Sequence, residues 1–485
     1  YYTGRIMTKN IARWFVLIPL FAIPFIPLLA PPLTNGFFFP FISGKGFAFR
    51  ILVEIALAGY VLLALADAKY RPKLSWVGVL FAAFTLWMAF ADTLAVNPMK
   101  AFWSNYERMD GWVTLAHIFA FFVIAGAVLA ADKLWRNWWM TFIGAAAIVA
   151  AYALLQLVGA FAIHQGSTRL DASLGNSAYL AVYMLFVTAV SVWQSLESKE
   201  KWMRNLLLAF AAISAFIIYE TQTRGAFYGL IGAAGVGAIL WMIESGKKGR
   251  ATAAGVFLTL LLVVGGLFLA KDTAFVQGSP ALARLSAVSA KDFGTRFTLW
   301  NMAIDGVKER PVTGWGQDGF NYIFNSRYQP SLYGQEPWFD RAHNTFLDWL
   351  VAGGVPALLL FLGLLAATVL SLYRPQASRA ERILLISALV GYSIQALVVF
   401  DNLFSYVPLA AVIAMAHAAS ARSWKKVDAL PVPSASTTDT MLAPIALVAG
   451  FALIWLVNAP GISGSYNLIA ALSTGDPASS MAYFK

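Results

Sequence analysis

The residues of this chain that are best suited to acid–base chemistry stand together in the stretch "FDRAHNTFLDWLVAGGVPALLLFLGLL", residues 339–365. Asp340, Arg341, His343 and Asn344 come immediately before its long apolar run. An unperturbed histidine pKa near ~6.5 suits a general base. The alternative is a polar cap on a membrane helix. The position of His343, at the expected membrane edge, favours the base.

The other three histidines are weaker candidates. His117 falls within the fourth apolar segment and His417 near the cytoplasmic end of the twelfth, so we interpret both as packing residues with satisfied hydrogen bonds. His164 begins a polar loop, where solvent is expected to surround it.

Arginines supply the second kind of chemistry, because a guanidinium binds phosphate in bidentate fashion. Arg224 in "YETQTRGAFYGLIGA" stands at a membrane edge, four residues after Glu220. It is either half of an i,i+4 ion pair that reaches outward or part of an anion site. Arg296 opens a predicted helix and, taken alone, fits a solvated face. Further arginines expected on the same side are Arg169, Arg327 and Arg341.

A metal site has little support in the sequence. No D-x-D or E-x-D occurs, and the carboxylate pairs in "ERMD" (107–110) and "EPWFD" (336–340) have no distinctive spacing. A leaving diphosphate must be neutralised by a divalent metal or by fixed guanidinium groups. A histidine base with several arginines therefore predicts transfer from a lipid pyrophosphate without metal or other cofactor.

The composition identifies an all-α polytopic membrane protein. Of 485 residues, 59% are hydrophobic and 12% charged, against roughly 25% charged in soluble domains. A net charge of +11 would suggest nucleic acid on a soluble domain. Here the basic residues lie between apolar segments, so membrane topology explains them and no nucleic-acid partner is expected. The absence of cysteine excludes disulfide and thiolate chemistry.

About thirteen apolar segments are long enough to span a bilayer. They lie near 11–34, 48–66, 74–92, 111–131, 137–163, 175–195, 203–219, 222–243, 251–270, 345–371, 383–400, 402–421 and 441–459. The first has no clear cleavage site and is interpreted as a membrane helix rather than a signal peptide. Because the chain starts at Tyr1 and not at methionine, we expect the natural protein to be longer.

Every second linker between these segments is a short basic cluster, such as Lys69/Arg71/Lys73 or Lys247/Lys248/Arg250. The positive-inside rule places these linkers, and the N-terminus, in the cytoplasm. The remaining linkers face outward, and one of them, at 271–344, is large. Aromatic residues near this outer face are expected to form an interfacial belt.

These patterns divide the chain into four parts. Residues 1–270 form N-terminal membrane helices, 271–344 the large outer loop, 345–459 the C-terminal membrane helices, and 460–485 an outer tail. Within the loop, 295–311 predicts an amphipathic helix ended by Pro311, followed by the glycine-rich turn "GWGQDGF". The tail is typical of the start of a tetratricopeptide-like helical hairpin.

Several motifs, in this order, resemble the O-antigen ligase/polymerase superfamily across roughly residues 100–420. They are "LGNSAYLAVYM" (174–184), "TQTRGAFYGLIGA" (221–233), "TRFTLWNMAIDGVKERPVTGWGQDGF" (295–320) and "DRAHNTFLDWLVAGGVPALLLFL" (340–362). The resemblance implies a C-type glycosyltransferase membrane fold with about 12–13 transmembrane helices. It also implies a bacterial inner, or cytoplasmic, membrane location with the active site facing the periplasm or the outside.

The resemblance further implies a metal-independent, inverting transfer of glycan from an undecaprenyl-diphosphate-linked oligosaccharide. The acceptor is lipid A–core in ligases, a lipid-linked glycan in polymerases and a protein hydroxyl in O-oligosaccharyltransferases. His343 is then the base, Arg224 and Arg296 hold the diphosphate, and Arg341 is an additional basic residue beside them. Asn344 orients His343, and Asp340 is a supporting residue.

Two features depart from the simple ligase pattern. The thirteenth segment and the tail resemble members with C-terminal helical repeats, which leaves the acceptor open. Asp401 and Asn402 in "FDNLFS" also lie at the outer face, with no assigned role.

The rival function is a transporter or flippase for the same lipid-linked glycan. It would use the same arginines without covalent chemistry. Alternating access usually places a site near the membrane midplane, where Glu54 is the clearest charge. The polar candidates instead gather on one outer face, which favours the enzyme.

Overall fold

The computed structural model describes residues 2–31, 33–165, 168–286, 290–334, 338–374 and 377–483, and gives only the backbone for 2–8 and 290–293. The described chain is helical and divides into two compact units. Unit 1 comprises 1–85, 103–145 and 410–485; unit 2 comprises 86–102 and 146–409. Each unit is described by itself.

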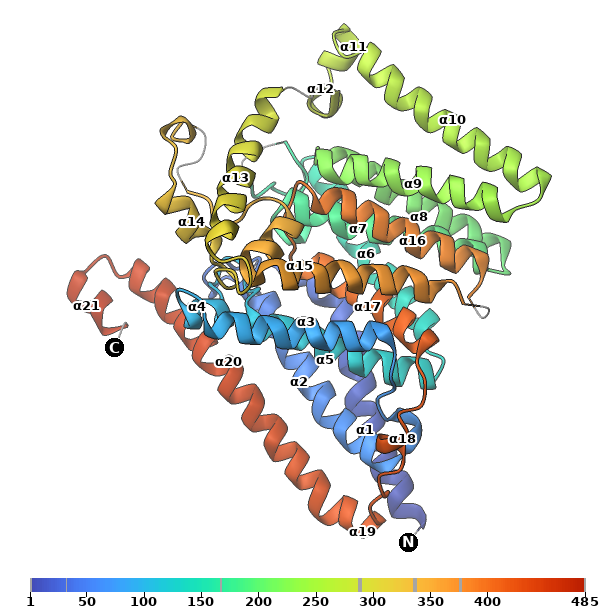
Figure 1. Cartoon of the computed structure of the whole chain (residues 1–485), viewed down its shortest axis with the longest axis vertical. Coiled ribbons are helices and arrows are strands. Elements are labelled where there is room, and N and C mark those ends of the chain that lie inside the picture. Colours follow the sequence, from blue (N-terminus) through green and yellow to red (C-terminus); the bar gives the residue numbers. More distant parts are fainter. Residues whose placement is uncertain are drawn as a thin grey trace. The chain divides into compact units, whose positions relative to one another are not determined.

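Unit 1 is built from long helices at both ends of the sequence (Figure 1). They are α1 (Tyr2–Ala22), α2 (Ser43–Ala66), the first part of α3 (Trp76–Thr93), α5 (Trp112–Ala131), the first part of α6 (Trp135–Leu157), the last part of α17 (Leu403–Ser420) and α20 (Ala443–Ser473). Short segments complete it, namely η1 (Ile23–Leu28), η2 (Ala68–Tyr70), α18 (Lys425–Asp428), α19 (Ala435–Thr437), η5 (Thr438–Leu442) and α21 (Pro477–Ala482).

Unit 2 holds the remaining parts of α3, α6 and α17 together with the other long helices. These are α7 (Ser177–Glu197), α8 (Lys201–Glu220), α9 (Arg224–Glu244), α10 (Lys247–Leu269), α15 (Thr345–Leu372) and α16 (Arg379–Ala396). Its shorter elements are α4 (Pro98–Trp103), η3 (Ala172–Leu174), α11 (Ala274–Gln277), α12 (Pro280–Ser286), α13 (Ala290–Glu309), α14 (Phe320–Ser326) and η4 (Pro330–Leu332).

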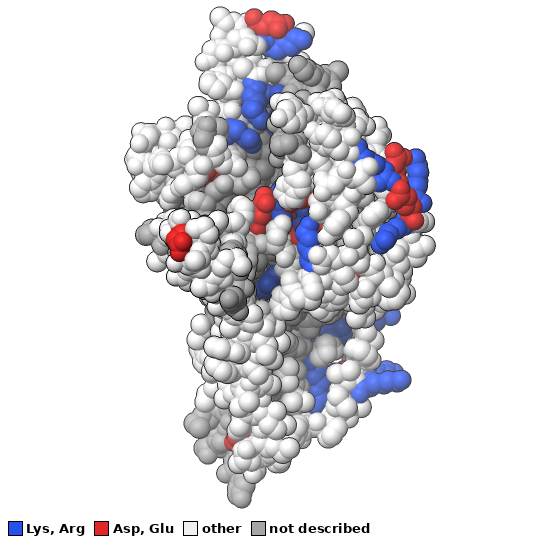
Figure 2. Space-filling view, turned by 90° about the vertical axis from the view of Figure 1, so that its left-hand side faces the viewer, with Lys and Arg blue, Asp and Glu red and all other residues white. Residues whose placement is uncertain are grey.

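The all-α membrane fold expected from the sequence is confirmed. Each of the thirteen predicted segments coincides with a helix, and twelve helices within the described ranges are long and apolar enough to cross a membrane. The exception is α16, which carries Arg379, Glu381 and Arg382 within its first turn. Figure 2 agrees, since most of the face that it shows has neither acidic nor basic side chains. The last long helix differs from expectation, because α20 continues past 459 to Ser473.

Inside unit 1, a buried polar cluster joins three helices. Glu54 of α2 contacts His117 Nε2 of α5 at 2.9 Å and accepts from Asn458 of α20 at 2.7 Å. His117 Nδ1 lies 2.6 Å from Val113 O, which can only accept, so Nδ1 donates. His417, also interpreted as a packing residue, has its Nδ1 2.7 Å from Ser75 Oγ. Both histidines are thus satisfied within the helix bundle, as expected.

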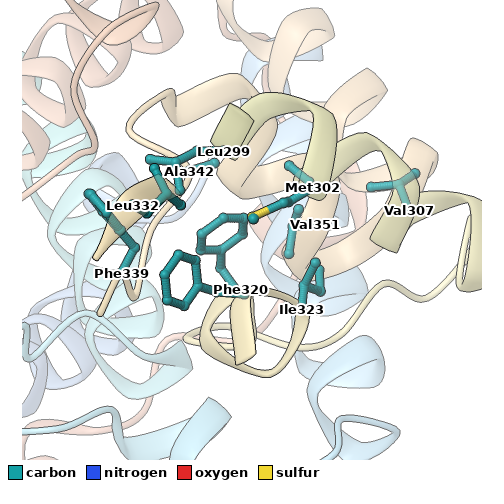
Figure 3. Close-up of a cluster of buried hydrophobic side chains, with 11 residues drawn as sticks. Leu299, Met302, Val307, Phe320, Ile323, Leu332, Phe339, Ala342 and Val351 are labelled. Carbon is teal, nitrogen blue, oxygen red and sulfur yellow. The ribbon is translucent and has the colours of Figure 1, made fainter. Parts of the chain in front are cut away.

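The outer loop of unit 2 folds around an apolar centre. The helix predicted at 295–311 is present as α13 and ends at Glu309, just before Pro311. Figure 3 shows the buried side chains that α13, α14 and α15 contribute to one cluster. Leu299 and Met302 of α13 meet Phe320 and Ile323 of α14, with Val351 of α15 beside them. This cluster fixes the loop helices on the start of α15.

A break in α15 attaches the glycine-rich turn. Gly353 and Gly354 have non-helical backbone angles, and Pro356 has no N–H to give to Ala352 O. The carbonyls of Val351 and Ala352 accept instead from the backbone N–H of Trp315 and Gly316, at 2.8 and 2.9 Å.

The donors and the remaining carbonyl at the break are satisfied as well. Val355 N–H donates to Pro311 O at 2.8 Å, and Trp87 Nε1 donates to Gly353 O at 2.7 Å. Gly354 has a φ of +70°, and a Cβ there would lie 2.2 Å from Val312 O. The turn and the helix therefore approach so closely that only glycine fits.

We expect Gly354→Ala to lower the stability of the protein. The left-handed backbone alone costs roughly 1–3 kcal/mol for a non-glycine residue, and the contact with Val312 O adds to this. The measurement is thermal unfolding of the detergent-purified protein. The control is Gly255→Ala on α10, where no atom lies within 4 Å of the added Cβ. Equal melting temperatures for the two variants would contradict the role of the break.

Candidate functional site

The turn that carries His343 is fixed on both sides. Arg341, nearly buried, forms an ion pair with the buried carboxylate of Asp318 in the glycine-rich turn. Between Arg341 and His343, Ala342 N–H donates to Asp348 Oδ1 at 2.8 Å, and Ala342 O accepts from Trp300 Nε1 at 3.1 Å. Helices α13 and α15 therefore both hold the backbone beside His343.

His343 has a strained backbone and a defined ring orientation. Its φ of +54° is unusual for a residue other than glycine. Nδ1 lies 3.2 Å from Arg341 O, and a carbonyl only accepts, so in the neutral ring Nδ1 carries the proton and Nε2 is the basic nitrogen. The imidazole meets Phe339 and Phe400 edge-to-face, with centroid distances of 5.5 and 5.3 Å. This arrangement suits a general base.

Asn344 is the N-cap of α15. Its Oδ1 accepts from the backbone N–H of Phe346 and Leu347, at 3.0 and 3.2 Å. Asn176, in "LGNSAYL", caps α7 in the same way, accepting from Ala178 N–H at 2.8 Å. Asn176 and Asn344, each in one of the quoted motifs, thus begin a membrane helix. The roles of Asn344 in orienting His343, and of the buried Asp340 in supporting it, stay predictions.

The cluster around Asp401 adjoins the same turn. Asp401 accepts from Tyr392 Oη and Ser405 Oγ, each at 2.7 Å. It follows Phe400, whose ring contacts His343. No role was assigned to Asp401 from the sequence. In the structure, its two hydrogen bonds fix the segment that carries the Phe400 ring.

Arg224 begins α9, where a helix N-terminus and a guanidinium both favour an anion. The alternative of a pair with Glu220 on one helix is wrong, because α8 ends at Glu220 and a turn with Gln222 at φ +53° separates it from α9. Arg224 Nε instead donates to Arg284 O on α12, at 2.8 Å.

Two further arginines join Arg224. Arg169 was expected on the same outer side, and Arg284 was not selected from the sequence. Arg284 Nε donates to Gln222 O at 3.2 Å. Arg169 Nε donates to Thr221 O at 3.0 Å, and its Nη2 to Thr223 Oγ1 at 3.1 Å. Burial, together with repulsion from Arg284, lowers the pKa of Arg169 to about 10. We call Arg169, Arg224 and Arg284 the arginine cluster.

The loop carrying Arg169 is held by Asp171, which is fully buried. Its Oδ1 accepts from Gln156 Nε2 at 2.7 Å, and its Oδ2 from His164 N–H at 2.9 Å. His164 Nδ1 also contacts Asp171 Oδ1, at 3.2 Å. His164 is exposed, as expected, and it also takes part in this support. Arg169 is the first residue of "RLDASLGN" (169–176), and its place in an outward-facing linker was the only sequence signal for it.

Two short connections link the arginine cluster to His343. Gly225, next to Arg224, lies against Val398, since a Cβ there would be 2.7 Å from Val398 Cγ2. Two residues after Val398, the ring of Phe400 contacts His343. Packed segments thus run from Arg224 to the imidazole.

Arg296 belongs to the same region through α13. It lies one turn before Trp300, whose indole donates to Ala342 O, and residues four apart share a helix face. Arg327 does not belong to it, because it pairs with the exposed Glu309. Among the described residues, no three acidic or histidine side chains are placed to hold a metal ion. Glu336 of the "EPWFD" pair lies outside the described residues.

Residues 208–362 match the family model described as O-antigen ligase. This segment is similar to O-antigen ligase domains. It runs from α8 through the outer-loop helices into α15, and it contains Arg224, Arg284, Arg296, Arg341 and His343. The resemblance seen in the sequence is thereby confirmed. A search of curated proteins found no match to the chain.

The O-antigen ligase domain and the helices together support a multi-pass inner-membrane protein with an O-antigen ligase/polymerase-type function. The corresponding activity is that of an enzyme of glycosyltransferase or ligase type. Lipid bilayer and glycan are the partners that follow from this.

We expect Asn344→Ala to destabilise the protein by about 1 kcal/mol, the usual value of an N-cap. Asn344→Asp keeps an acceptor and should retain stability. Chemical unfolding of both variants measures their free energies of unfolding. Asn176→Ala on α7 is the matched control, because it removes an equivalent N-cap from another helix. An unchanged unfolding midpoint in Asn344→Ala would show that the cap does not contribute.

Proposed function

We propose that the protein transfers a glycan from an undecaprenyl-diphosphate-linked oligosaccharide to an acceptor hydroxyl on the outer face of the inner membrane. The observation that carries the proposal is the pairing of an oriented histidine with the arginine cluster, of which Arg224 and Arg284 lie with His343 inside the segment that matches the O-antigen ligase model. A base and a set of phosphate-binding cations are what such a transfer requires.

In the proposed step, the acceptor oxygen attacks the anomeric carbon of the donor sugar. His343 Nε2 takes the hydroxyl proton as the new C–O bond forms. The bond between the anomeric carbon and the diphosphate oxygen breaks, and undecaprenyl diphosphate leaves with its electron pair. Because attack and departure occur on opposite faces of the carbon, a single displacement inverts the configuration.

The arginines hold the leaving group in this proposal. Charge-assisted bonds from guanidinium to phosphate are strong and directional. Arg169, Arg224 and Arg284 surround the N-terminus of α9, whose dipole adds to their attraction for an anion. Arg296 on α13 approaches from the side of His343. No metal is needed, because the fixed positive charges neutralise the diphosphate.

The acceptor remains to be chosen among lipid A–core, a second lipid-linked glycan and a protein hydroxyl. Purified protein incubated with the lipid-linked donor and each acceptor in turn would identify it, with mass spectrometry of the products. A ligase joins the glycan to lipid A–core, a polymerase lengthens the lipid-linked glycan, and an O-oligosaccharyltransferase modifies protein. Absence of any glycan transfer would reject the proposal in favour of a transporter.

His343→Ala should reduce the turnover number roughly 10²- to 10⁴-fold, the usual contribution of a general base. Donor binding should change little, because the arginine cluster remains. Single-turnover transfer and donor binding measured on the same preparation separate these effects. Parallel reactions with EDTA should retain full activity; loss in EDTA with rescue by a divalent cation would overturn the metal-free step, and wild-type turnover in the variant would overturn the base.

Arg169→Ala and Arg284→Ala should each weaken donor binding roughly tenfold or more, equivalent to ~1.4 kcal/mol or more. Each removes one guanidinium from the arginine cluster, and lysine at either position should restore part of the loss. The matched control is Arg327→Ala, whose exposed pair with Glu309 is expected to contribute ~1 kcal/mol at most. Titration with undecaprenyl diphosphate is the measurement. Equal affinities in all three alanine variants would exclude Arg169 and Arg284 from the site.

A further inference from the structure

An apolar groove of about 420 Å³ lies in unit 2, between α7, α9, α10 and α16. Its α9 wall is one helix face, formed by Leu230, Ala233, Ala234, Gly237, Ala238 and Trp241. Three of these helices, α7, α9 and α10, are long and apolar enough to cross a membrane, and α16 packs against α7 and α9. We therefore expect the groove to face lipid.

The hydroxyl groups in the groove walls are turned away from any ligand. Thr188 Oγ1 donates to Met184 O, Ser387 Oγ to Ile383 O and Thr252 Oγ1 to Lys248 O, each on its own helix. The groove therefore offers hydrocarbon contacts only. A chain that fills it must be apolar along its whole length.

The groove begins below the arginine cluster and descends along the same helix. With a rise of about 1.5 Å per residue, Leu230 lies roughly 9 Å and Trp241 roughly 26 Å below Arg224. One leaflet of a bilayer core is about 15 Å thick. A molecule that is anchored at Arg224 and fills the groove to Trp241 must therefore extend beyond one leaflet, farther than the acyl chain of an outer-leaflet phospholipid.

Helices α9 and α10 form two of the groove walls. They meet at the turn between Glu244 and Lys247 and diverge toward the end of α10 that leads to α12 (Figure 1). Arg284 of α12 lies at the wide end and belongs to the arginine cluster. At the narrow end, the guanidinium carbon of Arg379 lies over the ring of Trp241, 5.8 Å from its centroid. A lipid with a charged headgroup and one long tail matches this layout.

We propose that this groove binds the distal part of the polyisoprenoid tail of the donor, while the arginine cluster holds its diphosphate. The inference rests on the proposed function for the identity of the donor. It adds a second binding site, deep in the membrane, that only a carrier lipid with a long tail can fill. Donors with short prenyl tails reach the arginine cluster and leave the groove empty.

The first experiment is a binding measurement that needs no catalysis. Undecaprenyl diphosphate with a photoreactive group near its free end is crosslinked to the wild-type protein in phospholipid nanodiscs. The expected labels lie on peptides containing Leu196, Trp241 and Ile383, at the deep end of the groove. Labels on other helices would overturn the inference. Equal labelling of these peptides by a phosphatidylglycerol probe would do so too, because the groove would then be a general lipid site.

Variants that fill the groove give the second test. Ala234→Phe and Ala189→Leu place bulk between its walls, and Ala254→Phe adds the same ring on the exposed face of α10 as a matched control. For the wild type and the control, kcat/KM should be roughly tenfold higher for the long-tailed donor than for a short-tailed one. In the filled variants this ratio should fall to near one, with the short-tailed rate unchanged.

An unchanged ratio in both filled variants would overturn the inference. The retained rate with the short-tailed donor shows that a filled variant is folded and active. A wild-type protein that transfers from neither donor, yet is crosslinked in the groove, would refute the proposed function and leave the tail site standing. The two conclusions are thus tested separately.

Discussion

The break in α15 is the constraint on which the outer site depends. An unbroken helix would use the carbonyls of Val351 and Ala352 internally, and the backbone N–H groups of Trp315 and Gly316 in the glycine-rich turn would lose these acceptors. Because Pro356 lacks an N–H and Gly354 adopts a left-handed backbone, those carbonyls pair with Trp315 and Gly316 instead. The turn then places Asp318 against Arg341, two residues before His343. Helix-breaking residues therefore serve here to position the candidate base.

Positive charge gathers at the start of α9 at an electrostatic cost. Burial and repulsion from Arg284 lower the pKa of Arg169, yet at about 10 it stays above neutrality, so the side chain remains cationic. The buried carboxylate of Asp171 holds the loop that carries Arg169. Arg224, at the N-terminus of α9, adds a third guanidinium. An anion would offset the repulsion within the cluster, which favours the diphosphate site proposed here.

The sequence predicted those parts of the fold that depend on local pattern. Membrane helices follow from apolar length, so each predicted segment coincides with a helix, and Pro311 marked the end of α13 correctly. His343 and Arg224 stood out because charged residues at a membrane edge are costly without a purpose. The segment expected at 441–459 is longer in the structure, because α20 continues through Pro460 to Ser473.

The residues that were missed share a different property, because their importance depends on contacts between distant segments. Arg284 lies in unremarkable polar sequence, and Arg169 was expected only to face outward. Only the fold brings Arg169 to Thr221 and Arg284 to Gln222. Asp171 and Asp318 are likewise ordinary loop acids until burial turns them into supports. A motif in sequence therefore marks the groups that perform chemistry, whereas the groups that hold them are chosen by packing. For a membrane enzyme with few charges, each buried carboxylate beside an arginine or a histidine is a strong sign of such support, because its desolvation would otherwise destabilise the fold.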